Sequence, residues 1–192
     1  MTYEEMKEKL KSRLKPTRYE HSVGVADTAV VLAKRFGVNV EKARIAGLLH
    51  DCARQFPNEQ LPTEAEKRHI TYGMVEKNMP LLLHGYVGAR LIEEEYGIAD
   101  GEISQAIYRH TVGGADMTDL DKIIYFADMI EPGRRYPGVD ELRSLAKTAT
   151  LDEMVLAGLT RSIEFVLEKG HLIHPDTVIA RNEILIKVHV NI

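Results

Sequence analysis

The chain has 192 residues, a length that fits one domain with a substantial apolar core. Its formal charge of −4 gives no electrostatic case for binding nucleic acid or an anionic membrane, so we expect a small-molecule ligand. The single cysteine, Cys52, excludes a disulfide framework, and no run of about 18 apolar residues is present to span a bilayer.

The N-terminal segment, residues 1–6, is acidic and amphipathic. A secretory signal peptide would be basic at first and then apolar. Together with the lone cysteine, this segment predicts a cytoplasmic protein.

Apolar residues recur with a helical period along almost the whole chain, and no stretch alternates with the period of two that is typical of strands. A Thr followed three residues later by a Glu forms a capping box, and four such pairs indicate helix starts: Thr2 with Glu5, Thr17 with Glu20, Thr63 with Glu66, and Thr150 with Glu153. Three glycines suited to the left-handed position after a helix indicate helix ends: Gly37, Gly97 and Gly170. The predicted helices cover residues 3–14, 18–36, 40–53, 63–69, 83–96, 101–110, 119–130, 139–148, 151–169 and 176–187.

These elements predict an all-α fold, a single helical bundle of about nine to ten helices over residues 1–192. The N-terminal helix 3–14 and the C-terminal helix 176–187 are expected to pack on the core bundle. No break between helices is long enough for an interdomain linker. The last residues, 188–192, are expected to form a frayed tail, and the acidic, apolar C-terminal helix would permit a homodimer.

The first candidate site residue is His21, one turn into the predicted helix 18–36. It shares a mostly apolar helical face with Val25, Thr28, Ala29 and Leu32, so its side chain should point inward. A lone inward histidine is more often a satisfied core residue than a ligand, so His21 alone predicts no function.

His50 and Asp51 follow the apolar run 43–49 directly. An imidazole and a carboxylate at that place are either a structural pair or ligands of a cation. Adjacent residues differ by about 100° around a helix axis, so both reach one ion only at a helix end. The polar residues 54–55 and then Pro57 indicate that the helix ends here.

Asp128 lies in the nearly apolar stretch 123–130. An ionised carboxylate left unpaired in a core is costly, and no Lys or Arg follows within one turn, so either a distant Arg or a metal must supply the cation. Two imidazoles and two carboxylates form a mixed nitrogen and oxygen donor set. Such a set suits iron, manganese, zinc or nickel better than calcium.

Two further histidines lie beside glycines. His84 begins the predicted helix 83–96 and is followed by Gly85 and Gly88, which permit close approach of a backbone or ligand. His110 closes the helix 101–110. Three roles stay open for each histidine: ligand of a second metal, contact to a phosphate oxygen, or cap of a helix C-terminus.

The order His21, His50-Asp51, Asp128 resembles the H…HD…D signature of the HD-domain metal phosphohydrolases, an all-helical superfamily. Within that superfamily, residues 18–186 resemble the bacterial symmetrical diadenosine-tetraphosphate hydrolases. Four segments carry the resemblance: HDCAR at 50–54, HGYVGA at 84–89, RHTVG at 109–113, and KIIYFADMIEPGR at 122–134. The last segment, with its EPGR continuation, is the most specific.

The resemblance implies hydrolysis of diadenosine tetraphosphate to two ADP molecules through a metal-activated water, with one or two iron ions as cofactor. It implies His21, His50, Asp51 and Asp128 as metal ligands. His84 and His110 would either hold a second ion, bridged by Asp51, or contact the product diphosphate of ADP or GDP. We therefore expect Asp51, His84 and His110 to be the catalytic residues. Asp51 is the first candidate to orient or deprotonate the water.

The polyphosphate substrate needs additional positive charge at the site. Arg54 follows His50 by one turn and Arg134 follows the Asp128 helix, and a guanidinium offers bidentate donation to phosphate. Thr111 could add a neutral donor. The alternative for each arginine is an exposed side chain on a solvated loop.

Symmetric cleavage requires a site that seats one complete nucleoside diphosphate. The turn at residues 170–176 is the candidate nucleoside pocket, and the resemblance points to the same turn: Gly170, His171, Leu172, Ile173, His174, Pro175 and Asp176. Its histidines and aliphatic residues could stack on a base, although helix punctuation by the glycine and proline already explains much of the segment. The resemblance also implies substrate contacts from His21, His84, His110 and Asp128.

Two alternative functions stay open. The first keeps the metal and changes the substrate to a nucleoside monophosphate, a guanosine alarmone or a cyclic dinucleotide. The second is a regulator that binds a nucleotide without turning it over.

Overall fold

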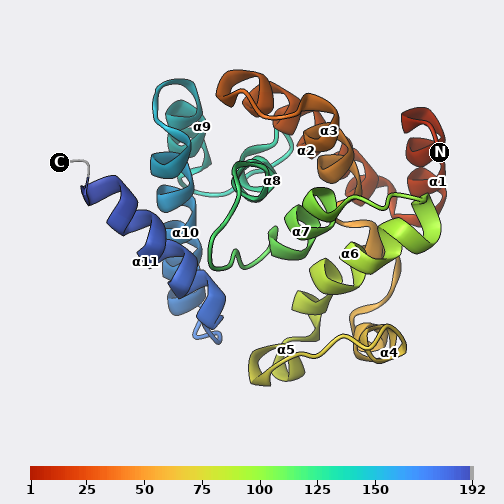
Figure 1. The fold of residues 1–192 in the computed structure, drawn as a ribbon. Coiled ribbons are helices and arrows are strands. Elements are labelled where there is room, and N and C mark those ends of the chain that lie inside the picture. Colours follow the sequence, from red (N-terminus) through yellow and green to blue (C-terminus); the bar gives the residue numbers. More distant parts are fainter. Residues whose placement is uncertain (191–192) are drawn as a thin grey trace.

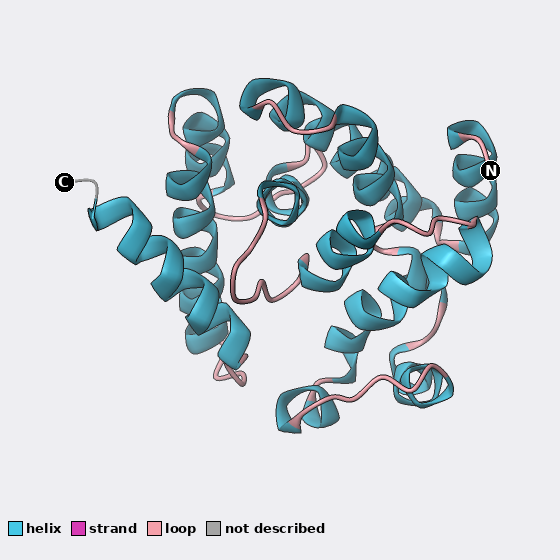
Figure 2. Cartoon of the chain, in the orientation of Figure 1, coloured by secondary structure: helices cyan, strands magenta, loops and turns pink. Residues whose placement is uncertain are grey.

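The computed structural model describes residues 1–190, which contain eleven α-helices, three short 3-10 helices and no β-strand (Figures 1 and 2). The helices are α1 (Tyr3–Arg13), α2 (Pro16–Phe36), α3 (Val40–Leu49), η1 (Cys52–Gln55), η2 (Asn58–Gln60), α4 (Leu61–Lys67), α5 (Met74–Asn78), η3 (Pro80–Leu82), α6 (Leu83–Tyr96), α7 (Gly101–Arg109), α8 (Asp119–Ile130), α9 (Val139–Thr148), α10 (Leu151–Glu168) and α11 (Pro175–Val190). The predicted all-α fold is confirmed. No helix of the described chain is long and apolar enough to cross a membrane.

Two of the four predicted capping boxes are present. Thr2 and Glu5 cap α1, and Thr150 and Glu153 cap α10, each with the reciprocal pair of hydrogen bonds. The three glycines expected after helices are all left-handed, with φ of +71° at Gly37, +69° at Gly97 and +65° at Gly170. Local sequence signals therefore define these helix ends correctly.

The other two capping boxes were wrong, and a proline explains each case. The helix α2 begins at Pro16, so Thr17 lies inside its first turn with Glu20 and caps nothing. The helix α4 has Pro62 in its first turn and begins two residues before Thr63, which leaves Glu66 without a capping role. The fixed φ of proline suits the first turn of a helix, and it moved both starts upstream.

Three further boundaries differ from the prediction. The helix expected over 40–53 ends at Leu49, and η1 follows after His50 and Asp51. The helix α5 lies in a segment expected to be a loop, and it makes the total eleven rather than nine to ten. The helix α11 extends to Val190, past the expected start of a frayed tail at 188; residues 191–192 lie outside the described chain.

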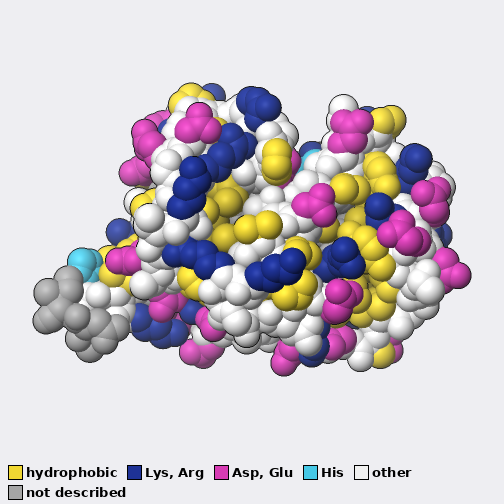
Figure 3. Space-filling model, turned by 90° about the horizontal axis from the view of Figure 1, so that it is seen from above, with side chains coloured by type: hydrophobic (Ala, Val, Ile, Leu, Met, Phe, Trp, Pro, Cys, Tyr) yellow, Lys and Arg dark blue, Asp and Glu magenta, His cyan; other side chains and the backbone are white. Residues whose placement is uncertain are grey.

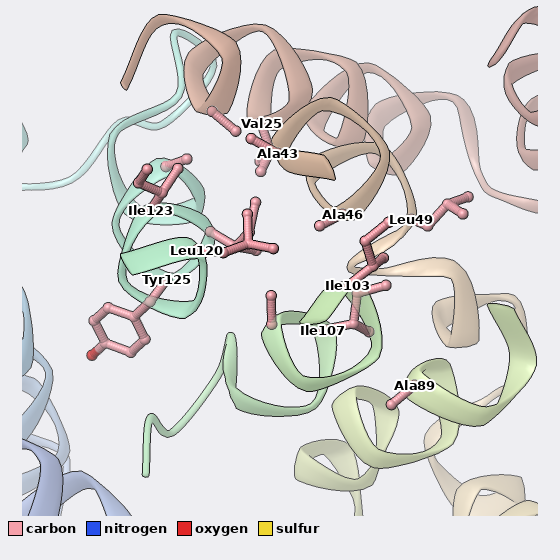
Figure 4. Packing of buried hydrophobic residues seen from close by; sticks show 14 of the residues in the cluster. Val25, Ala43, Ala46, Leu49, Ala89, Ile103, Ile107, Leu120, Ile123 and Tyr125 are labelled. Carbon is pink, nitrogen blue, oxygen red and sulfur yellow. The ribbon is translucent and has the colours of Figure 1, made fainter. Parts of the chain in front are cut away.

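The core lies where α8 packs against α2, α3 and α7 on one side and against α10 on another. Figure 4 shows Val25, Ala43 and Leu120 converging from three helices. Close approach of α2 to α3 depends on Gly47, because a Cβ there would lie 2.8 Å from the Cα of Ala26. This packing holds the ends of α3 and α7 beside α2 and α8.

The hairpin of α10 and α11 and the pair α4 and α5 lie on opposite sides of the molecule in Figure 1. The face seen from above in Figure 3 carries a curved row of Lys and Arg side chains next to exposed apolar ones. Positive charge is therefore locally concentrated, although the chain as a whole is acidic.

Candidate functional site

Six side chains predicted from the sequence meet in one cluster. His21 comes from α2, His50 and Asp51 follow the end of α3, and Asp128 comes from the last turn of α8. The remaining two are His84, in the first turn of α6, and His110, which directly follows α7. Their ligand atoms form three overlapping groups of three within 4.8 Å: His21, His50 and Asp51; His50, His110 and Asp128; and Asp51, His84 and His110.

Asp51 lies at the centre of this cluster and is almost fully buried. Its Oδ2 lies 3.7 Å from Nε2 of His21 and 3.5 Å from Nε2 of His50. Its Oδ1 lies 3.2 Å from Nε2 of His84 and 3.9 Å from Nε2 of His110. The two carboxylate oxygens thus face two different pairs of imidazoles.

Three of the imidazoles are oriented in the same way by the backbone. In each, Nδ1 lies within hydrogen-bond distance of the carbonyl oxygen three residues earlier, and since a carbonyl only accepts, Nδ1 carries the proton. These bonds join His50 to Gly47, His84 to Leu81, and His110 to Ile107. Each Nε2 therefore presents a lone pair to the cluster, which is how histidine ligates a metal.

The lone pairs approach one another closely. Nε2 of His84 lies 3.0 Å from Nε2 of His110, and Nε2 of His21 lies 3.2 Å from Nε2 of His50. Two neutral acceptors at this distance repel unless a cation or proton lies between them. The hydroxyl of Thr111 reaches both His84 and His110, but it has one proton to donate. The donor set therefore fits a metal ion of the iron, manganese, zinc or nickel type.

Glu131 orients the fourth imidazole. Its Oε1 lies 3.2 Å from Nδ1 of His21, and the glutamate is 4% exposed. Two glycines make room for this carboxylate, since a Cβ at Gly24 or Gly133 would lie within 3 Å of a Glu131 oxygen. The sequence analysis missed Glu131, although its position one turn after Asp128 was a usable signal.

Burial and neighbouring charges move the histidine pKa values apart. Burial lowers the pKa of His50, and it lowers the pKa of His110 to about 3, with the neighbouring imidazoles acting in the same direction. Burial also opposes protonation of His21, but the hydrogen bond to Asp128 and its charge outweigh burial and raise the pKa. The pKa of His21 is thus shifted in the direction opposite to those of His50 and His110.

The two carboxylates stay ionised despite their burial. Burial opposes ionisation of Asp51, but the facing imidazoles hold its pKa well below the usual range. The pKa of Asp128 is also lowered, because the hydrogen bond from His21 and the charge of Arg134 outweigh burial. Arg134 pairs with the Asp128 carboxylate, and its Nε donates to the Asp128 carbonyl oxygen at 2.7 Å. The cation that the apolar stretch required is thus an arginine from outside α8.

A cavity of about 620 Å³ adjoins the cluster. Thr111 and Arg134 both contact the cluster and line the cavity. The cavity wall is mostly apolar and includes Met129, Tyr136, Phe165 and Val166, which the sequence analysis missed. No sequence signal marks these residues, because helix packing alone brings them to one space.

The turn at 170–176 contributes part of this wall. Leu172, Ile173 and His174 line the cavity, whereas the other four residues of the turn, Gly170, His171, Pro175 and Asp176, do not. The nucleoside contacts predicted for this turn stay predictions.

His174 is held by the protein through both ring nitrogens. Nδ1 accepts the backbone N–H of Asp176 at 3.1 Å, so Nε2 is protonated and donates to Oε1 of Glu76 at 2.8 Å. The hydroxyl of Tyr86 donates to the same glutamate oxygen at 3.0 Å. His174 therefore fixes the turn to α5 and α6 and presents its ring, not a free nitrogen, to the cavity.

Two arginines lie near Asp51. The Nη1 of Arg18 lies 2.8 Å from Oδ2 of Asp51, a contact that the sequence analysis missed although Arg18 precedes His21 by one helical turn. Arg54 donates to Oδ1 of Asn58 at 3.1 Å and does not line the cavity. The predicted phosphate contact of Arg54 stays a prediction.

Comparison with known proteins identifies the protein family to which the chain belongs. Residues 18–133 match the model of the HD domain, and the chain belongs to the HD-domain family. This family assignment agrees with the H…HD…D order of the clustered residues.

Three relatives are similar over nearly the whole chain. The symmetrical bis(5'-nucleosyl)-tetraphosphatase of Bacillus subtilis is 40% identical over 182 residues, covering 95% of this chain and 97% of that protein. The protein of the same name from Staphylococcus aureus is 34% identical over 179 residues, covering 93% and 92%. A crystal structure from Clostridium acetobutylicum, described as a predicted HD superfamily hydrolase involved in NAD metabolism, has a TM-score of 0.92 at 41% identity and covers 97% and 98%.

Proposed function

We propose that this protein is a metal-dependent hydrolase that cleaves dinucleoside tetraphosphates symmetrically, diadenosine tetraphosphate to two ADP molecules. The observation that carries the proposal is the position of Asp51 between two imidazole pairs, beside a cavity that shares Thr111 and Arg134 with the cluster. The names of the relatives from Bacillus subtilis and Staphylococcus aureus support the substrate.

The proposed metal ligands are His21, His50, Asp51 and Asp128, with His84 and His110 completing a second group around Asp51. When bound, a divalent metal lowers the pKa of a coordinated water toward about 7 and polarises a phosphoryl oxygen. The carboxylate of Asp51 accepts a hydrogen bond from the attacking water and orients it. The apolar surroundings strengthen these electrostatic contacts, since less water is present to screen them.

The cavity determines which phosphoanhydride bond reaches the cluster. Its apolar wall, with Leu172 and Ile173, takes the nucleoside, while Arg134 and Thr111 contact the attached diphosphate. A complete nucleoside diphosphate then fills the space between the wall and Asp51. Under this proposal, the bond between the second and third phosphates is the one that lies at Asp51.

Iron is the proposed metal, on the basis of the family resemblance and the mixed donor set. Elemental analysis of protein purified without oxygen tests this proposal. Iron as the main metal supports it. Zinc or manganese in place of iron would reject iron and leave the donor set intact.

Product analysis tests the activity. The metal-loaded protein is incubated with diadenosine tetraphosphate under reducing conditions, and the nucleotides are separated by chromatography. ADP as sole product supports the proposal, and the guanosine substrate should give GDP. AMP together with ATP contradicts symmetric cleavage, and tight binding without turnover would show a nucleotide-binding regulator instead.

Asp51→Asn provides the matched variant, and Asp27→Asn, at an exposed position on α2, provides the control. Asp51→Asn should lose turnover and bound metal while the helical fold persists, since one carboxylate serves both groups. The control should retain both. Full activity of the metal-depleted Asp51→Asn protein would rule out the proposed chemistry.

A further inference from the structure

Arg18 contacts the cluster at Asp51 and is not among the cavity-lining residues. Its Nη1 donates to Oδ2 of Asp51 at 2.8 Å, and its side chain is 34% exposed. No other side-chain hydrogen bond of Arg18 is present within residues 1–190, and Arg18 does not line the cavity. Most of the donors on its guanidinium are therefore open to a ligand that lies against Asp51.

Arg54 is near enough to Arg18 for the two positive charges to interact, and it has no acidic partner within ion-pair distance in the described chain. Burial lowers the pKa of Arg54, and the charge of Arg18 acts in the same direction, whereas Asp51 acts against them. The carboxylate of Asp51 thus pairs with Arg18 alone, and the charge of Arg54 is left without an ion-pair partner among the described residues. Such an excess of positive charge is stabilised when an anion binds between the two side chains.

Metal binding increases this excess of positive charge. When Asp51 ligates a metal, its negative charge is shared with the cation. The same carboxylate then neutralises less of the positive charge of Arg18 and Arg54. Arg134 differs from both, because it contacts the carboxylate and the carbonyl of Asp128 and lines the cavity. The arginines therefore fall into two sets, one at Asp51 and one at Asp128.

The substrate chemistry matches these two sets. A dinucleoside tetraphosphate has one diphosphate on each side of its central anhydride bond, and the cavity with Arg134 takes one of them under the function proposed above. Resting on that function, we propose that Arg18 and Arg54 bind the second diphosphate, that of the nucleoside outside the cavity. Each half of the substrate then has its own arginine contacts on either side of Asp51.

Binding measurements separate the two halves. Calorimetry on the metal-loaded protein compares ADP with a diadenosine tetraphosphate analogue that has a methylene group in place of the central bridging oxygen. We expect the wild-type protein to bind the analogue more tightly than ADP. Arg18→Ala should weaken binding of the analogue by about 10-fold or more, which is the loss expected for a charge-assisted hydrogen bond. The same variant should change the affinity for ADP by less than about 2-fold. Arg54→Ala should act in the same direction.

Two comparisons keep the proposal open to refutation. Arg134→Ala should weaken the binding of both ligands. Arg90→Ala, at an exposed position on α6, should leave the binding of both unchanged. Equal weakening of both ligands by Arg18→Ala, together with lost metal, would show that Arg18 only positions Asp51 and would overturn the proposal. Unchanged analogue binding in Arg18→Ala would overturn it as well.

The experiments distinguish failure of the proposed function from failure of the proposed role of Arg18. If the wild-type protein binds the analogue but releases no ADP from diadenosine tetraphosphate, the hydrolase is rejected while the binding series still decides the role of Arg18. Arg18→Lys provides a final comparison, since it keeps the charge and loses the forked donors. Partial recovery of analogue affinity in Arg18→Lys supports direct phosphate contact.

Discussion

Glu131 contacts His21 from behind: its Oε1 lies 3.2 Å from Nδ1 of the imidazole, whose Nε2 points at Asp128 from 2.9 Å. A buried carboxylate in this position fixes the ring and makes the ligating nitrogen more basic. His21 thus depends on a residue that follows Asp128 by three positions. The C-terminal end of α8 therefore carries both the proposed ligand Asp128 and the residue that orients the proposed ligand His21.

Glu131→Ala should lower metal affinity by about 10-fold to 100-fold, the range typical of residues that orient a metal ligand. Glu131→Gln should cause a smaller loss, because its amide oxygen still accepts from Nδ1. Titration of the metal-free proteins with metal measures both. Glu20→Gln, at an exposed position on α2, is the control, and wild-type affinity in Glu131→Ala would show that His21 needs no support.

The glycine at position 47 is predicted to be essential for packing. A Cβ at Gly47 would lie 2.8 Å from the Cα of Ala26. The backbone of Ala26 cannot move away as easily as the end of a flexible side chain could. Gly47→Ala should therefore lower the free energy of unfolding by about 1–3 kcal/mol, measured by urea denaturation. Gly101→Ala, where the added Cβ meets nothing within 4 Å, is the control. Equal stability of the two variants would refute the close contact of α2 and α3.

The stability of the metal-free protein should depend on pH through its buried imidazoles. Burial lowers the pKa of His110 from 6.5 to about 3, so between these values the unfolded chain binds more protons than the folded chain. Stability is then present above pH 6.5 and lost as pH falls toward 3. His50 acts in the same direction, and His21, whose pKa is raised, opposes them.

We therefore expect a lower urea midpoint at pH 5 than at pH 7, with a contribution from His110 on the order of 1–2 kcal/mol. In His110→Asn the difference between the two pH values should shrink. A pH dependence identical to that of the wild-type protein would mean that folding does not lower the pKa of His110.

Metal content should distinguish the two imidazole pairs. His84→Ala should reduce turnover sharply and still retain at least one metal, because His21, His50 and Asp128 stay intact. His50→Ala should lose more metal, since His50 belongs to two of the three donor groups. Elemental analysis of both variants decides this. Equal loss in the two variants would contradict a separate role for His84.

Local signals predicted the helices and the cluster well. Candidate ligands such as His21 and Asp128 could be predicted because a polar residue on an apolar helical face is conspicuous in any sequence. The short helix α5 was missed because five residues give too little periodicity, and because tertiary contacts such as that of Glu76 with His174 hold it.

Contacts between distant segments could not be predicted in the same way. Arg18 and Asp51 are 33 residues apart, and only the packing of α2 on α3 brings them together. The cavity wall is the extreme case, because it joins residues of η3, α8, α10 and the turn before α11. Local sequence indicated the candidate donors, whereas helix packing determined the contact of Arg18 with Asp51 and the shape of the cavity.

Hydrolysis of diadenosine tetraphosphate in ¹⁸O-labelled water tests the central claim most directly, because it reports the bond attacked and the attacking group together. Mass spectrometry should find ADP as the sole product, with one ¹⁸O atom on the terminal phosphate of half of the ADP molecules. AMP with ATP, or ADP without label, would contradict water attack on the central phosphoanhydride bond at Asp51.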